Sequence, residues 1–164
     1  MASYFAEVTE KTVQEGEVCP DILSLLLNCL YALDTLDKPL EQVKAVFQLR
    51  LLTLTGLAPL LDTCVVCGNP QPAEPRLHLL QGVLHCAACR TQVGDGVSMP
   101  LSPAALAAAR YIVAGEAKKL FSFSLTPEAC KQLDQVTEAF LMTQQERGFR
   151  TLDYYKQLRR QSFS

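Results

Sequence analysis

The chain has 164 residues, of which 49% are apolar and 20% are charged, and its formal net charge is −2. This length fits one domain with a sizeable buried core, and the slight negative charge excludes a protein that coats nucleic acid through bulk electrostatics alone. Residues 22–33 form the longest apolar run, but Ser24 and Asn28 interrupt it, so it is too short and too polar to span a bilayer and no membrane partner is expected.

The acidic first part of the chain predicts two helices. Residues 1–10 lack the basic start and apolar core of a signal peptide, so we expect a cytoplasmic protein. Apolar residues then recur at three- and four-residue spacing over residues 20–33, which predicts a helix with one buried face. A second stripe of this kind predicts a helix over residues 39–54, with proline in its first turn and a glycine and a proline that stop it.

The apolar spacing that predicts helices stops in a cysteine-rich segment, residues 64–89. Three prolines keep the early part of this segment out of regular structure. Two short apolar stretches follow, residues 77–80 and 83–85, joined by Gln81 and Gly82. Because glycine supplies the positive φ that a tight turn needs, the segment is interpreted as a small hairpin.

The rest of the chain predicts three helices. Serine followed by proline at 102–103 is typical of a helix start, and an alanine-rich helix is expected to reach roughly Leu120. The same device at 126–127 opens a helix that we expect to end near Gly148, and Thr151 is expected to cap a last short helix. The apolar residues expected to face inward on that last helix are Leu152, Tyr155 and Leu158.

Two CxxC pairs, Cys64 with Cys67 and Cys86 with Cys89, predict a structural zinc site. Each pair directs two thiolates at one centre, and two pairs complete a tetrahedron with no position left for water or substrate. Gly68, directly after the first pair, suits a turn whose backbone conformation disfavours side chains. The expected fold is therefore mainly α, a compact helical domain with an inserted four-cysteine zinc knuckle and hairpin that resembles a zinc ribbon.

Other uses of the cysteines and histidines are weaker interpretations. Buried or redox cysteines, or an iron–sulfur cluster, fit this spacing less well than Zn²⁺. His85 is a possible alternative ligand, but four thiolates suffice, so His78 and His85 are expected to be ordinary hairpin residues. The cysteines without a partner at metal spacing are expected in the core, and they are Cys19, Cys29 and Cys130. The sequence contains neither a serine–histidine–acid arrangement nor a glycine-rich phosphate loop, so we expect no enzyme.

One stretch of the sequence carries a family resemblance. The run FQLRLLTLTGLAPLLDTCVVCG, residues 47–68, resembles the segment in which the bacterial recombination mediator RecO passes from a helix into its zinc knuckle. The hairpin that ends in the second cysteine pair, and residues 140–158, are also similar to the C-terminal part of that family. The resemblance covers the chain from about Ile22 onward.

The resemblance implies a non-enzymatic DNA repair and recombination protein of the bacterial RecFOR pathway. RecO proteins support strand annealing and recombinase loading through contacts with single-strand-binding protein, RecR and DNA, both single- and double-stranded. It also implies a cytoplasmic, nucleoid-associated location, and it transfers the role of zinc ligand to the four cysteines. The helical part of the family is associated with docking the acidic, apolar tail of single-strand-binding protein, which needs an apolar groove with a cationic rim.

RecO proteins carry an N-terminal OB-fold ahead of the helical part, and residues 1–20 are too few to supply such a barrel. We therefore expect residues 1–164 to form one RecO-like C-terminal helical domain with its zinc finger at about residues 60–92. Because OB-folds usually bind the DNA, we expect this chain to bind it weakly.

Six arginines are candidates for contact with DNA or a partner, because they lie near the knuckle or in the basic end of an otherwise acidic chain. They are Arg50, Arg90, Arg147, Arg150, Arg159 and Arg160. The simpler interpretation of the basic end is a solvated helix face. The alternative function is a generic zinc-ribbon module for protein interaction in nucleic-acid machinery, and a redox or metalloenzyme use of the CxxC pairs is the third possibility.

Overall fold

The computed structural model describes the backbone of residues 1–13 and 19–162, and the side chains of residues 1–13 and 19–158. It confirms a mainly α fold with a small antiparallel sheet. The α-helices are α1 (Ala2–Thr12), α2 (Pro20–Asp34), α3 (Leu40–Leu54), α4 (Pro103–Ala114), α5 (Pro127–Gln145) and α6 (Arg150–Ser162). No helix in the described part of the chain combines the length and apolarity that crossing a membrane requires.

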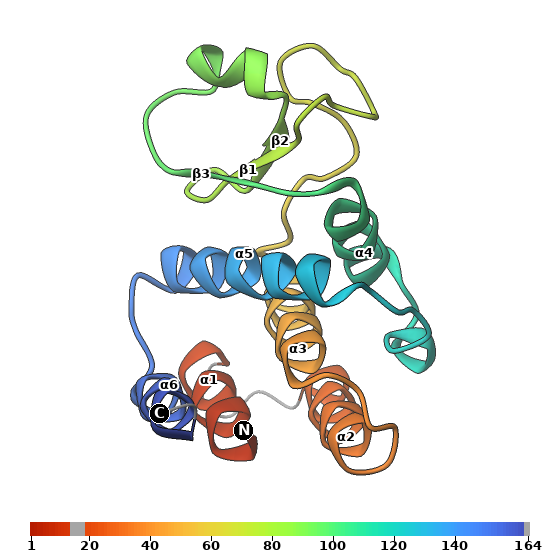
Figure 1. The fold of residues 1–164 in the computed structure, drawn as a ribbon, viewed down its shortest axis with the longest axis vertical. Coiled ribbons are helices and arrows are strands. Elements are labelled where there is room, and N and C mark those ends of the chain that lie inside the picture. Colours follow the sequence, from red (N-terminus) through yellow and green to blue (C-terminus); the bar gives the residue numbers. More distant parts are fainter. Residues whose placement is uncertain (14–18, 163–164) are drawn as a thin grey trace.

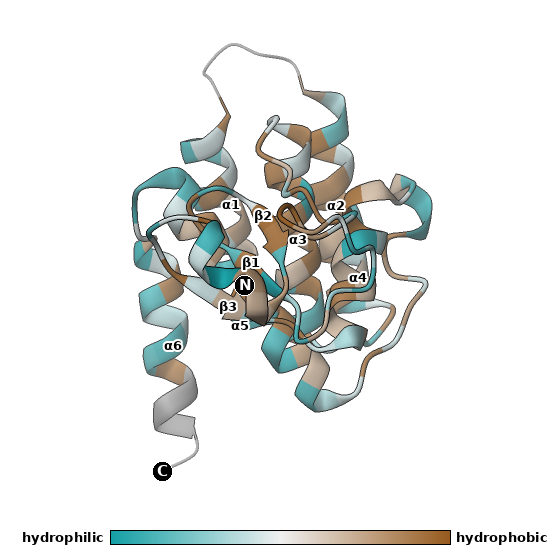
Figure 2. Ribbon diagram, turned by 90° about the horizontal axis from the view of Figure 1, so that it is seen from above, coloured by the Kyte–Doolittle hydropathy of each residue, from teal (hydrophilic) through white to brown (hydrophobic). Residues whose placement is uncertain are grey.

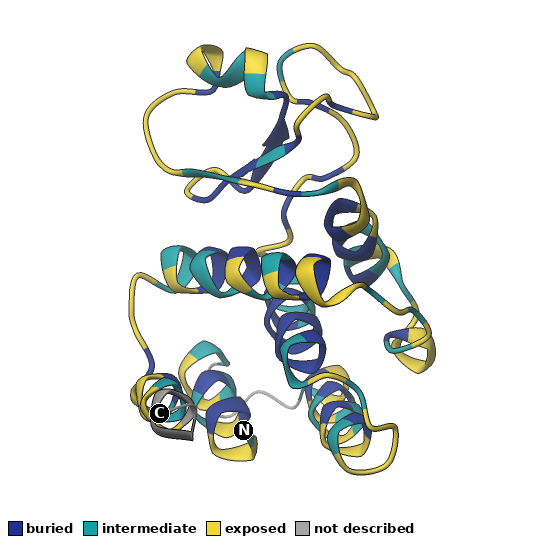
Figure 3. Ribbon diagram, viewed as in Figure 1, coloured by how far each residue is buried: buried dark blue, intermediate teal, exposed yellow. Residues whose placement is uncertain are grey.

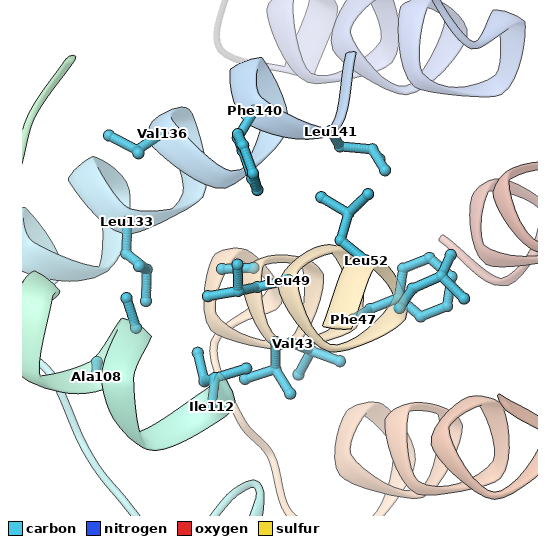
Figure 4. Packing of buried hydrophobic residues seen from close by; sticks show 14 of the residues in the cluster. Val43, Phe47, Leu49, Leu52, Ala108, Ile112, Leu133, Val136, Phe140 and Leu141 are labelled. Atoms are coloured by element: carbon cyan, nitrogen blue, oxygen red, sulfur yellow. The ribbon is translucent and has the colours of Figure 1, made fainter. Parts of the chain in front are cut away.

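Helix α3 forms the centre of the molecule, with α2, α4 and α5 packed around it (Figure 1). Its side chains are buried on nearly every face, which explains why its sequence shows a less clear polar side than the other helices. Figure 4 shows Leu52 of α3 directed toward Phe140 and Leu141 of α5. On another side of α3, Val43 lies beside Ile112 of α4. Burial of these side chains supplies the main driving force for folding.

Helix α1 is an element that the sequence analysis did not predict. Its Phe5 ring lies 4.3 Å from that of Phe47, centroid to centroid, and its Tyr4 ring meets that of Phe149 edge-on at 6.0 Å. The Tyr4 hydroxyl also accepts a 2.7 Å hydrogen bond from the Gln48 side chain. Helix α1 therefore closes the core between α3 and the start of α6, and Figure 1 shows α1 and α6 side by side.

The small sheet lies at the opposite end of the molecule from α6 (Figure 1). Its strands are β1 (Arg76–His78), β2 (Val83–His85) and β3 (Ser98–Pro100), in the order β2-β1-β3 with antiparallel pairing. The predicted hairpin is confirmed, although its turn spans residues 79–82, and β3 extends the unit past the expected boundary at residue 92. Gly82 has a φ of +64°, and a Cβ there would lie 3.3 Å from the Phe140 ring, so glycine suits both the turn and its contact with α5.

Two predicted details of the later helices are wrong, the end of α4 and the burial of Leu158. Helix α4 ends at Ala114 instead of Leu120, because a short 3-10 helix, η2 (Ala117–Lys119), follows Gly115. Helix α5 ends at Gln145, near Gly148 as expected, and Glu146 after it takes a left-handed conformation. Leu158 of α6 is 44% exposed, whereas Leu152 is buried as expected.

Candidate metal centre and partner-binding pocket

The structure brings Cys64, Cys67, Cys86 and Cys89 together. Their sulfur atoms all lie within 4.8 Å of one another, and the Sγ atoms of Cys67 and Cys86 are 3.7 Å apart. The first pair lies in the turn before β1, and the second lies where β2 passes into the 3-10 helix η1 (Ala87–Gln92). Gly68 has the positive φ expected of it, at +71°. A cluster of this kind can hold a metal ion.

The electrostatics of the cluster favour a bound cation. Burial alone would raise the pKa of Cys64, but the backbone N–H groups of Cys67, Cys86 and Val66 lower that pKa to about 6. Burial and the neighbouring sulfur atoms raise the pKa of Cys86, and they raise that of Cys89 to about 12. Four thiolates this close therefore repel one another unless a cation lies among them.

Arg110 of α4 holds the first cysteine loop against the helices, and the sequence analysis did not single it out. Its guanidinium donates to the carbonyl oxygens of Leu61, Asp62 and Pro70 at 2.8, 2.9 and 2.7 Å. On the other side of the unit, Gln144 of α5 donates to the backbone of the β1–β2 turn. The helices therefore fix the position of the part of the chain that holds the four cysteines and the three strands, called the cysteine-bearing unit below.

Both histidines are buried in the sheet and lie outside the sulfur cluster. His85 lies within hydrogen-bond distance of the Cys86 carbonyl and the Ser98 hydroxyl, at 2.8 and 2.9 Å. His78 accepts from the backbone N–H of Gln81 at 3.2 Å, and its other ring nitrogen lies 3.1 Å from the Asp95 carbonyl. The expectation that they are hairpin residues agrees with these contacts. Cys29 and Cys130 are also buried as predicted, whereas Cys19 is partly exposed.

An open pocket of about 970 Å³ lies between α3, α5 and α6. Its apolar walls come from Pro39, Leu125, Pro127, Cys130 and Tyr155. The polar and charged residues that line it are Glu41, Lys44, Lys131, Asp134, Gln135, Glu138 and Lys156. The sequence analysis could not locate this pocket, because its walls come from segments that lie far apart in the sequence.

An ion network forms one wall of the pocket. Lys44 of α3 is 4% exposed and contacts Asp134 at 3.1 Å and Glu138 at 2.6 Å, while Lys156 of α6 also pairs with Glu138. Burial would lower the pKa of Lys44, but the two carboxylates outweigh it and raise that pKa. Burial raises the pKa of Asp134 to about 6, and Lys44 offsets only part of this effect.

The structure does not gather the candidate arginines at one place. Arg50 donates to the last carbonyl groups of α4, and Arg90 donates to the carbonyls of Gly94 and Gly96, so both hold parts of their own chain. Arg147 and Arg150 are exposed where α5 passes into α6. The side chains of Arg159 and Arg160 lie outside the described residues. Figure 2 shows α6 extending away from the rest of the molecule.

Comparison with known sequences assigns the chain to a protein family. A family model described as recombination protein O C terminal matches residues 1–153. The chain belongs to the RecO family. The match begins at residue 1, so it also includes α1, which the resemblance from Ile22 onward left out.

Curated relatives named DNA repair protein RecO agree with this assignment. The protein of Acetivibrio thermocellus is 28% identical over 97% of this chain and 62% of its own length. The protein of Alkaliphilus metalliredigens is 25% identical over 96% of this chain and 63% of its own length. A protein of an Anaeromyxobacter species is 33% identical over 85% of this chain and 54% of its own length. The chain therefore spans between 54% and 63% of the length of these three relatives.

Proposed function

We propose that the chain is the non-enzymatic C-terminal part of a RecFOR-type recombination mediator, which supports annealing and recombinase loading through single-strand-binding protein, RecR and DNA. Membership of the RecO family supports this proposal. The structural observation that carries it is the pocket between α3, α5 and α6, because it combines apolar walls with the accessible cations of Lys131 and Lys156. That is the chemistry by which an acidic peptide with an apolar end is recognised.

We assign the pocket to the acidic, apolar tail of single-strand-binding protein. Leu125, Cys130 and Tyr155 line an apolar surface for the last side chain of the tail. Lys131 is exposed, and Lys156 is 43% exposed in its side chain, so both ammonium groups can reach carboxylates of the peptide. Lys44 is nearly buried and engaged by Asp134 and Glu138, so its role is to hold the pocket wall.

We propose that the four cysteines hold one structural Zn²⁺. A tetrahedral zinc–thiolate centre with Zn–S distances of about 2.3 Å has sulfur atoms about 3.8 Å apart. The separation of 3.7 Å between the Sγ atoms of Cys67 and Cys86 fits that edge. With four protein ligands the site keeps no open position for a substrate, so the metal joins the loop before β1 to the segment after β2 and does not catalyse a reaction.

Fluorescence anisotropy of the full zinc-loaded chain tests the assignment. The probes are a labelled acidic peptide with an apolar C-terminal residue and a free carboxylate, and labelled single-stranded DNA, each across a salt series. We expect Lys131→Glu and Lys156→Glu to weaken peptide binding about tenfold each, because each variant places a carboxylate where a cation is needed. Lys119→Glu, on η2 and paired with Glu116, is the matched control.

The measurements with single-stranded DNA distinguish a DNA-binding surface from the peptide pocket. Charge reversal at Arg147 and Arg150 is expected to weaken any salt-sensitive DNA binding and to leave peptide affinity unchanged. Peptide binding that is unaffected by the two lysine variants would contradict the pocket assignment. Silence toward both probes would favour the generic zinc-ribbon interaction module over the mediator.

A further inference from the structure

Helix α2 carries an apolar stripe that no described part of the chain covers. Leu23, Leu27, Leu30 and Tyr31 are 58%, 59%, 39% and 55% exposed. The opposite face of α2 packs on the core through Ile22, Leu25, Cys29 and Ala32. Figure 3 shows α2 at the edge of the molecule, with exposed and buried residues alternating along it. Large apolar side chains grouped in this way mark an interaction surface more often than single exposed ones do.

The spacing of the stripe indicates the shape of its partner. Leu23, Leu27, Leu30 and Asp34 follow one another at intervals of four, three and four residues, which is the a/d pattern of a coiled-coil seam. Such a seam packs best against another helix, whose side chains fit between those of the first. From residue 23 to residue 34 it is about 16 Å long, so it matches about two to three turns of a partner helix.

Asp34 gives the seam a specific charge. It is exposed in the last turn of α2, where the helix carbonyl groups already make the end of the helix negative, and α2 has no basic residue there to offset it. In the described part of the chain no hydrogen bond or ion pair engages the Asp34 carboxylate. The Asn28 side chain of α2 donates to the Ala117 carbonyl of η2, and Lys119 of η2 is paired with Glu116. The C-terminal end of the seam therefore favours a cation.

We propose that the α2 seam binds an amphipathic helix of a partner protein, with apolar residues at a and d positions and a lysine or arginine opposite Asp34. A second copy of this chain fits less well, because parallel packing would set Asp34 against Asp34 and antiparallel packing would set Asp34 against Leu23. The phosphates of DNA and the surface of an anionic membrane would be repelled by the same carboxylate. This surface is separate from the pocket between α3, α5 and α6.

Anisotropy with a synthetic amphipathic helix of about three heptads tests the proposal, at concentrations where the peptide alone is monomeric. One peptide carries leucines at a and d and a lysine at the position that faces Asp34, and its twin carries glutamate there. We expect the lysine peptide to bind the full chain at least about fivefold more tightly than the twin. Leu27→Glu should abolish binding, and Asp34→Lys should reverse the preference between the peptides.

The control variant is Leu80→Glu, which alters an equally exposed leucine in the β1–β2 turn and should leave binding unchanged. Because Leu27 is exposed, Leu27→Glu should also keep the melting temperature and the affinity for the acidic tail peptide. Equal affinity for both helical peptides, no binding of either, or binding that survives Leu27→Glu would overturn the proposal. So would a concentration-dependent dimer of the chain, seen by sedimentation, that Leu27→Glu dissolves, because a second copy would then occupy the seam.

Discussion

Arg110 makes more hydrogen bonds between the helices and the cysteine-bearing unit than any other side chain described above. It lies on α4, in the helical half, and its three hydrogen bonds reach backbone carbonyls on both sides of the first cysteine pair. A guanidinium suits this role because its planar fork offers several donors in fixed directions, which a lysine cannot reproduce.

We expect Arg110→Ala to lower the free energy of unfolding by about 2 kcal/mol, because three backbone carbonyls lose a charged donor. Hydrogen exchange should rise in residues 61–70 and stay low in α3. Arg110→Lys should recover part of the loss, and Arg147→Ala, whose side chain donates to the Gln145 carbonyl of its own segment, is the control. Unchanged exchange in residues 61–70 would show that the cysteine cluster holds this loop without Arg110.

Asp134 makes the pocket sensitive to pH. Burial raises its pKa to about 6, so the carboxylate loses its charge as the pH falls through that value. Two acids remain at the pocket, Glu138, whose lysine partners lower its pKa, and Glu41. The pocket is therefore more cationic at the lower pH.

We expect the affinity for the acidic tail peptide to rise about threefold between about pH 7.5 and about pH 5.5. Asp134→Asn should bind with the higher affinity at both values and flatten the dependence. Titration by anisotropy at matched ionic strength measures this. A wild-type affinity that falls as the pH is lowered would contradict the sign derived from Asp134.

At the scale of elements, α6 depends on a residue far away in the sequence. The carboxylate of Glu7 on α1 accepts from the backbone N–H groups of Arg150 and Thr151 at 3.2 and 2.9 Å, and also from the Thr151 hydroxyl. A carboxylate at a helix N-terminus satisfies donors that have no partner within the helix and interacts favourably with its dipole. Lys11 and Thr151 lower the pKa of Glu7 to about 2.

Glu7→Gln should lower stability by about 1 kcal/mol near neutral pH. Because the folded-state pKa lies below the unfolded value of about 4.5, the contribution is present above that value and is lost as the pH falls toward 2. Urea unfolding at pH values on either side of this window should show the difference between variant and wild type shrinking in acid. A difference that grows in acid would be inconsistent with this cap.

The same contact shows why sequence predicted some elements and not others. Helices α2, α3 and α5 were predicted because their apolar spacing is local information, and the cysteine cluster because each pair lies within one turn. Helix α1 is short, and its burial depends on Phe47 and Phe149, which sequence spacing cannot reveal. Thr151 was expected to cap α6 itself, whereas the donors there meet Glu7, which lies 144 residues earlier.

At the scale of the whole molecule, the helices and the cysteine-bearing unit have different sources of stability. The helices bury aromatic and leucine side chains from α1, α3 and α5 in one core. The cysteine-bearing unit has three short strands and a proline-containing loop, so we expect its order to depend on the proposed metal and on the contacts from α4 and α5.

Removal of Zn²⁺ with a chelator should therefore loosen residues 62–97 and leave the helical core folded. Hydrogen exchange should rise in that segment, while far-ultraviolet circular dichroism keeps most of its helical signal. Cys67→Ser should reproduce the effect without chelator, and Cys130→Ser, outside the cluster, should not alter metal content. A knuckle that stays protected after the metal has left would contradict a structural role for it.

The most direct test of the account is amide chemical-shift mapping of the ¹⁵N-labelled chain during titration with the acidic tail peptide. We predict shifts concentrated around Cys130, Lys131 and Asp134 of α5, Leu125 before it, and Tyr155 and Lys156 of α6, with small changes in the sheet and on the outer face of α2. Shifts concentrated in the cysteine-bearing unit or along α2, or none at saturating peptide, would contradict the assignment of this pocket to the tail and the mediator role that rests on it.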